Sequence, residues 1–150
     1  MPRPFLLDTS VLLHWVRNDL TAQLLEQKYQ LERAPFRPLI CEVSIGEMLA
    51  FSRKLGWGSN KQERLLQLED WLVIVDLSDR RVHEAYADLS TLALKSGWSL
   101  FNAKNDLWVA AAAKVAHCRL LTFDKDFLPL CAQPDWRVDV LDLRTCERLG

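Results

Sequence analysis

Four acidic side chains beside apolar segments are the groups in this chain best suited to metal-assisted chemistry. Asp8 directly follows Phe5-Leu6-Leu7, and Asp124 follows the apolar run 120–123 in the same way. Because open α/β sheets build their sites at the carboxyl ends of their strands, we expect both carboxylates at one sheet edge. Asp106, at the start of an apolar helix, and Glu47, in the first turns of another, can project over that edge. The sequence therefore predicts four acids in one pocket.

Four carboxylates close together are unfavourable without a counterion, since like charges raise one another's pKa. A divalent cation removes this conflict, and oxygen ligands suit magnesium or manganese better than zinc. Such an ion lowers the pKa of a bound water and orients it for attack on phosphorus. The expected chemistry is phosphodiester hydrolysis, with Mg²⁺ or Mn²⁺ held by Asp8, Glu47, Asp106 and Asp124.

Short apolar runs alternate with longer amphipathic segments, which is typical of an α/β domain. Strands joined through helices pair in parallel with right-handed crossovers, so we predict a three-layer α/β/α sandwich. The predicted strands are Pro4–Leu7, Pro38–Cys41, Leu72–Leu77, Arg119–Phe123 and Val138–Leu143.

Three helices are clear in the pattern. Val82, Leu89 and their apolar neighbours predict a helix over Asp79–Lys95, with Ser78 as its N-cap. The run over Leu107–Ala116 is apolar nearly all round and should be buried. A further helix is expected over 42–55, ended by Gly56-Trp57-Gly58-Ser59, and another begins near residue 60.

Composition restricts the class of protein. At 150 residues and 49% hydrophobic, the chain is long enough for one domain with a full core, and we predict one domain over 1–150. The longest apolar run is far too short for a membrane span, so a cytoplasmic protein is expected. The four cysteines lack metal or disulfide spacing, and buried reduced thiols are the simplest interpretation.

The net charge of −1 gives no bulk argument for binding a nucleic acid. We hypothesise that acids gathered at one metal site leave lysines and arginines elsewhere to meet phosphates. Six tryptophans are present, and most are expected in the core or at a dimer contact. Trp57, between two glycines, is the best candidate for stacking on a base.

Each acid taken alone has a structural alternative. Ser44 and Glu47 have the spacing of a capping box, in which the glutamate only ties back to the helix start. Asp106 fits a favourable charge at a helix N-terminus, and Asp124 fits a turn after a strand. Asp8 is different, because an aspartate between apolar runs is costly to bury without a partner.

The residues around these acids resemble the PIN-domain nucleases. Met1–Trp15, with F-L-L-D-T-S-V-L-L at its centre, resembles the opening of that family. Ser44–Leu49, Asn105–Ala111 and Leu121–Phe127 resemble its later motifs in the same order. The likeness covers nearly the whole chain and is greatest for the VapC-like ribonuclease toxins of bacterial toxin–antitoxin pairs.

This resemblance implies a parallel sheet ordered 3-2-1-4-5 and metal-dependent cleavage of single-stranded or loop RNA, leaving a 5′-phosphate and a 3′-hydroxyl. It makes Asp8, Glu47, Asp106 and Asp124 the metal ligands, with Asp126 replacing or supplementing Asp124 through a water. It also implies a homodimer and a small antitoxin protein that occupies the acidic groove. The polar neighbours expected to bond to the acids or their waters are Thr9, Ser10, Asn105 and Thr122.

Two other functions stay open. A PIN nuclease of RNA processing, or one acting on DNA, would use the same acids. A non-catalytic binding module that kept the fold is the alternative outside the enzymes, and the presence of all four acids argues against it. A phosphatase or nucleotide-binding domain is disfavoured, because neither a Gly-rich phosphate loop nor a D-x-D-x-[TV] motif follows the first strand.

Overall fold

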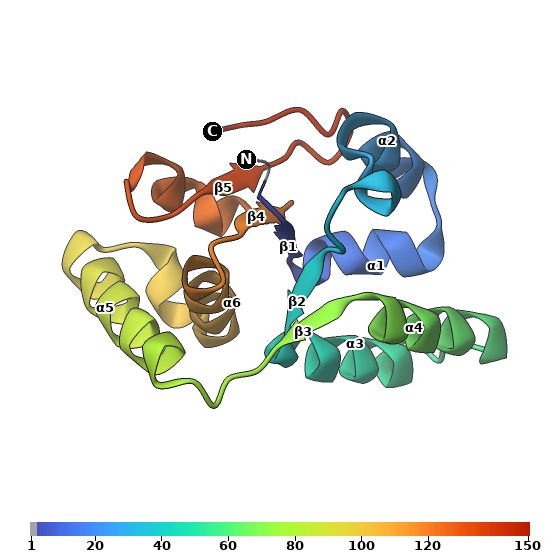
Figure 1. The fold of residues 1–150 in the computed structure, drawn as a ribbon, viewed down its shortest axis with the longest axis horizontal. Helices are drawn as coiled ribbons and strands as arrows, with labels where there is room; N and C mark the ends of the chain where they lie inside the picture. Colours follow the sequence, from blue (N-terminus) through green and yellow to red (C-terminus); the bar gives the residue numbers. More distant parts are fainter. Residues whose placement is uncertain (1–2) are drawn as a thin grey trace.

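A five-stranded parallel sheet forms the centre of the molecule, in the order β3-β2-β1-β4-β5 (Figure 1). The structure is a computed structural model and describes residues 3–150. The predicted α/β fold and strand order are confirmed. The strands are shorter than predicted: β1 (Phe5–Leu7), β2 (Leu39–Cys41), β3 (Val73–Val75), β4 (Arg119–Thr122) and β5 (Val138–Val140).

Helices cover both faces of the sheet. In Figure 1, α5 and α6 lie on one side of the strands, and α1, α3 and α4 lie on the other. Each of the first four strands leads into helical structure that returns to the start of the next strand, which keeps all five strands parallel. The helices are α1 (Thr9–Arg17), α2 (Leu20–Tyr29), α3 (Glu42–Lys54), α4 (Ser59–Trp71), α5 (Arg80–Ser96) and α6 (Lys104–Val115), with short 3₁₀ helices η1 (Leu31–Arg33), η2 (Ser99–Asn102) and η3 (Lys125–Ala132).

The alternating direction of side chains along the strands divides the core into two layers. Leu6 and Leu120 belong to the apolar cluster that includes α5 and α6, whereas Leu7 and Leu121 belong to the cluster that includes α1 and α4. Successive strand residues point to opposite faces, so one short apolar strand supplies both layers. Helix α6 is buried over 109–113, as its all-round apolar pattern predicts, and its alanines allow close packing.

Three local predictions were wrong. The N-cap of α5 is Asp79 and not Ser78, because the Asp79 carboxylate accepts a hydrogen bond from the Arg81 amide. Helix α6 spans Lys104–Val115 and not Leu107–Ala116, although Asp106 lies in its first turn as expected. Trp57 is only 6% exposed and packs in the core, so it is not available to stack on a base.

Within residues 3–150, no helix combines the length and the apolar character that a membrane crossing requires. All four cysteines are free thiols, as expected. Cys41, Cys118 and Cys146 are buried, and Cys131 is half-buried.

A buried aspartate in the middle of β5 joins four separate segments. Asp139 of β5 is 4% exposed and accepts hydrogen bonds from Arg119 of β4, at 2.9 Å, and from the Tyr29 hydroxyl of α2, at 3.2 Å. Arg148 of the C-terminal segment lies 3.2 Å from the same carboxylate. Because the two arginines neutralise it, the buried charge is tolerated.

We predict that Asp139→Ala lowers the free energy of unfolding by about 1 to 3 kcal/mol, since Tyr29 and the arginines lose a buried acceptor. Urea denaturation measures this change. Asp135→Ala, at an exposed aspartate four residues earlier, is the matched control and should change it by less than about 0.5 kcal/mol. Equal stability of the two variants would contradict a structural role for Asp139.

Candidate active site

Asp8 is held at the carboxyl edge of the sheet by backbone and hydroxyl groups. Its amide donates to the Leu121 carbonyl at 3.0 Å, which extends the pairing of β1 with β4 by one residue. Its carboxylate Oδ2 accepts hydrogen bonds from Thr122, at 2.7 Å, and from Ser10, at 2.9 Å. The Thr122 and Ser10 oxygens in turn accept the Asp124 and Phe123 amides. The strand ends of β1 and β4 are therefore joined through one carboxylate.

Burial dominates the ionisation of Asp8. The residue is 3% exposed, and desolvation raises its pKa above the ordinary value, with the negative charge of Glu47 adding to this effect. Hydrogen bonds from Thr122 and Ser10 stabilise the carboxylate and oppose the rise in pKa. The site thus keeps a buried acid whose charged form has hydroxyl donors but no cationic partner within residues 3–150.

Glu47 is directed toward Asp8's neighbour and not toward the start of its own helix. Its Oε1 lies 2.7 Å from the Thr9 hydroxyl, which is also 3.0 Å from the Ser44 hydroxyl. A carboxylate only accepts, so Thr9 is the donor to Glu47. Helix α3 begins at Glu42 with Cys41 as N-cap, so the capping-box interpretation of Ser44 and Glu47 is wrong.

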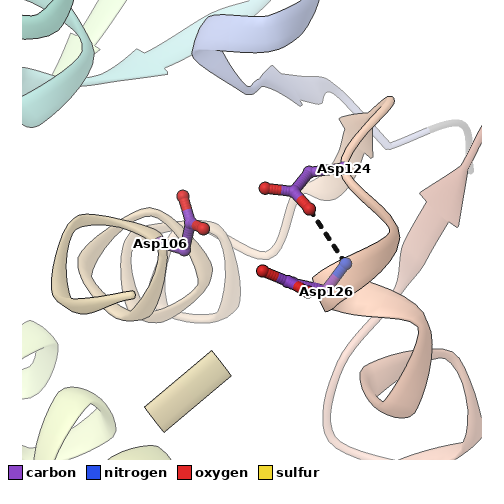
Figure 2. Close-up of side chains that lie close together, drawn as sticks. All are labelled: Asp106, Asp124 and Asp126. Atoms are coloured by element: carbon purple, nitrogen blue, oxygen red, sulfur yellow. Dashed lines mark hydrogen bonds between the residues drawn. The ribbon is translucent and has the colours of Figure 1, made fainter. Parts of the chain in front are cut away.

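Asp106, Asp124 and Asp126 form the tightest group of acids (Figure 2). One carboxylate oxygen from each lies within 4.8 Å of the others. Figure 2 shows Asp106 pointing from α6 toward the other two, which come from the segment after β4. Asp124 caps η3 by accepting the Asp126 amide at 2.9 Å, and this turn brings both carboxylates to the same side. Asp124 can therefore be both a turn residue after the strand and a member of the acidic cluster.

The acids around Asp106 change its ionisation strongly. Burial, followed by the negative charges of Asp8, Asp124, Glu47 and Asp126, raises the pKa of Asp106 to about 7. All five acids therefore act on one region. Electrostatic repulsion of this kind, at a group held in place by a buried helix, is typical of a site that receives a cation or works as an acid or base.

Comparison with known proteins shows the family of this chain. A family model for the PIN domain matches residues 5–131. The chain belongs to the PIN domain family. No curated protein matches it.

Solved structures share the PIN fold at low sequence identity. VapBC2 from Rickettsia felis, in a crystal structure with a DNA fragment from the VapBC2 promoter, is similar to this chain with a TM-score of 0.73 and 18% identity. The match covers 92% of this chain and 98% of the other. VapBC-5 from Mycobacterium tuberculosis gives 0.64 at 22% identity, with 93% and 100% covered. FitAcB from Neisseria gonorrhoeae gives 0.65 at 23% identity, with 89% and 95% covered. The resemblance to the PIN-domain family that the sequence indicates is therefore confirmed for the family and its fold.

The acids of this PIN domain suit a small divalent ion. Oxygens on one Mg²⁺ lie 2.0–2.1 Å from the ion, so two opposite ligands are about 4.2 Å apart. The oxygens of Asp106, Asp124 and Asp126 lie within 4.8 Å of one another, so rotation of these side chains can bring all three around one ion. Within residues 3–150 none of the three forms an ion pair with a lysine or arginine. Their negative charge is therefore available to bind a metal ion.

Of the polar neighbours expected from sequence, Thr9, Ser10 and Thr122 bond to acids as described, but Asn105 does not. Asn105 is exposed on the first turn of α6, and its side chain has no hydrogen bond within the described residues. Ser99 of η2, which sequence reasoning missed, donates to Asp126 Oδ1 at 2.9 Å. No local signal marks Ser99, because its contact spans 27 residues of chain.

Proposed function

We propose that this PIN domain protein is a Mg²⁺- or Mn²⁺-dependent endoribonuclease and the toxin of a toxin–antitoxin pair. One observation supports the proposal above all others. Five acids from α3, α6 and the segments after β1 and β4 gather at the carboxyl edge of the sheet, and no lysine or arginine within residues 3–150 forms an ion pair with any of them. Such a donor set suits a hard cation, and hydrolysis of a phosphodiester is a reaction that such a cation promotes.

We assign each of these five acids a role in binding the ion. Asp106, Asp124 and Asp126 hold the ion, and Asp8 and Glu47 complete the shell directly or through water. When bound, the ion supplies an activated water and stabilises charge on the leaving oxygen. Thr122 and Ser10 hold Asp8, Thr9 holds Glu47 and Ser99 holds Asp126, so the carboxylates of these three acids are already oriented by hydrogen bonds.

The solved relatives indicate which partners this chain would have. The solved relatives include a member of the VapBC family of toxin–antitoxin systems and a toxin–antitoxin complex from Klebsiella pneumoniae. We propose that a cognate antitoxin covers the acidic pocket of this chain and that the protein forms a homodimer. A nuclease of RNA processing, or one specific for DNA, is the second candidate, since its acids would be the same.

Purified protein freed of any antitoxin tests the function. Incubation with total RNA should give discrete cleavage products in Mg²⁺ or Mn²⁺ and none in EDTA, and mapping of the 5′ ends locates the cut. Single-stranded and duplex DNA of matched length serve as competing substrates. Cleavage of DNA alone would support the second candidate, and no cleavage of any substrate with either metal would contradict a nuclease.

Thr122 allows a test that does not depend on turnover. Thr122→Val keeps the volume of a fully buried side chain but removes its hydroxyl. That hydroxyl donates to the Asp8 carboxylate and accepts from the Asp124 amide. We predict that the Kd for Mn²⁺, measured by titration calorimetry, rises about 10- to 100-fold. Thr91→Val, at an exposed threonine of α5, should leave this Kd unchanged. An unaltered Kd in Thr122→Val would argue against this positioning.

A further inference from the structure

Charge is segregated between the two edges of the parallel sheet. Acids follow the strands: Asp8 after β1 and Asp76 after β3 are examples, and Asp124 stands two residues beyond β4. Arginines stand at the other edge, where the strands begin. Because all strands are parallel, these arginines lie at one edge of the sheet and these acids at the other. The arginines are Arg3 before β1, Arg37 before β2, Arg119 at the start of β4 and Arg137 before β5.

The basic edge contains a cavity of about 240 Å³ with aromatic walls. Phe5 and Tyr29 line it, with their rings edge-to-face at 5.3 Å, and Phe36 lines it while remaining 49% exposed. Arg3 and Arg33 line the same cavity. Prolines at 4, 35 and 38 complete much of the wall and restrict its backbone.

The arginines at this cavity are available to a ligand. Within residues 3–150, no carboxylate lies within ion-pair distance of Arg3, Arg33 or Arg37. Asp139, the buried acid nearby, is already bound by Arg119 and by Arg148. Arg3, Arg33 and Arg37 therefore bring unpaired positive charge, within the described residues, beside the exposed ring of Phe36.

A basic groove with aromatic side chains is the composition that binds single-stranded nucleic acid, in which phosphates meet arginines and a base stacks on a ring.

We infer that the amino-terminal edge of the sheet is a second RNA-binding site, remote from the acids. One nucleotide of a single-stranded substrate places its base against Phe36 in the cavity and its phosphates on Arg33 and Arg37. This inference rests on the proposed ribonuclease function and names how its substrate is held. It also gives the hypothesised phosphate-binding arginines a defined place.

Fluorescence anisotropy with a labelled, unstructured 12-nucleotide RNA tests the site. EDTA is present throughout, so binding is measured without cleavage and all variants share the same metal-free acid pocket. For Arg33→Gln/Arg37→Gln, the slope of log affinity against log salt should become shallower by about 1.4, since each phosphate contact on a single strand contributes about 0.7. Arg53→Gln/Arg80→Gln, at exposed arginines of α3 and α5, is the matched control and should keep the wild-type slope.

Phe36→Ala isolates the stacking contact. We expect RNA affinity to fall about 5- to 150-fold with the salt slope unchanged. Leu66→Ala, at a leucine 61% exposed on α4, is the apolar control. Slopes and affinities equal to those of the controls would overturn the inference, as would displacement of the RNA by an equal concentration of poly-glutamate or duplex DNA. A wild-type protein that cleaves RNA while the edge variants bind it normally would leave the proposed function standing and remove this site alone.

Discussion

Asp106→Asn should reduce RNA cleavage in Mg²⁺ by more than about 100-fold, because even partners that only orient metal ligands cost about 10- to 100-fold when removed. Asp106 lies at the centre of the acids, where Asp8, Glu47, Asp124 and Asp126 all act on its charge. The amide keeps the size of the side chain and removes the negative charge. Asp88→Asn, at an exposed aspartate of α5, should cleave at the wild-type rate.

The same substitution should stabilise the metal-free protein at pH 8. Asp106→Asn removes a charge that is repelled by its neighbours, so we expect the free energy of unfolding to rise by about 1 to 2 kcal/mol after allowance for solvent screening. Loss of cleavage together with loss of stability would mean that the residue acts through folding. Cleavage retained near the wild-type rate would reject Asp106 as a ligand.

Asp8→Asn extends this test to the most buried acid. The asparagine oxygen can still accept from Thr122 and Ser10, so the network between β1 and β4 can persist while the charge is lost. We expect cleavage to be abolished and thermal unfolding in EDTA to be nearly unchanged or raised. Full activity of Asp8→Asn would show that this charge is not needed.

The second prediction with a large effect concerns the stability of the metal-free protein, which should fall as the pH rises and recover when a metal ion binds. The pKa of Asp106 is about 7 in the folded protein and 3.8 is its ordinary value, so between these values the folded state binds the additional proton. Stability of the metal-free protein is therefore fully present below about pH 4 with respect to this group and falls as pH rises to about 7. The raised pKa of Asp8 acts in the same direction.

At pH 8, Mn²⁺ at about 100 times its Kd should add about 2.7 kcal/mol to the free energy of unfolding and raise Tm by about 5 to 10 °C. Melting curves in EDTA from pH 5 to 8, and then with Mn²⁺, measure both effects. The comparison with Asp106→Asn is decisive, since this variant should show a weaker fall with pH and a smaller gain from Mn²⁺. Identical profiles for variant and wild type would contradict a cation site at Asp106.

Local sequence was sufficient to predict the acids nearest the strands. An acid placed directly after an apolar strand must lie at the carboxyl edge of a parallel sheet, so the locations of Asp8 and Asp124 follow from strand pattern alone. The buried helix behind Asp106 follows from its apolar composition in the same way. These inferences succeed because strand alternation and helix periodicity depend on neighbours in the chain.

Only the tertiary structure decided which polar groups share one site. Asp126 joins Asp106 and Asp124 because a short turn at η3 directs it there, and Asn105 points to solvent although it adjoins Asp106. Glu47 meets Thr9 across 38 residues, and this contact excludes the capping box that spacing alone allowed. The direction of a side chain depends on the local turn and on which distant segment packs beside it, and neither is encoded in spacing along the chain.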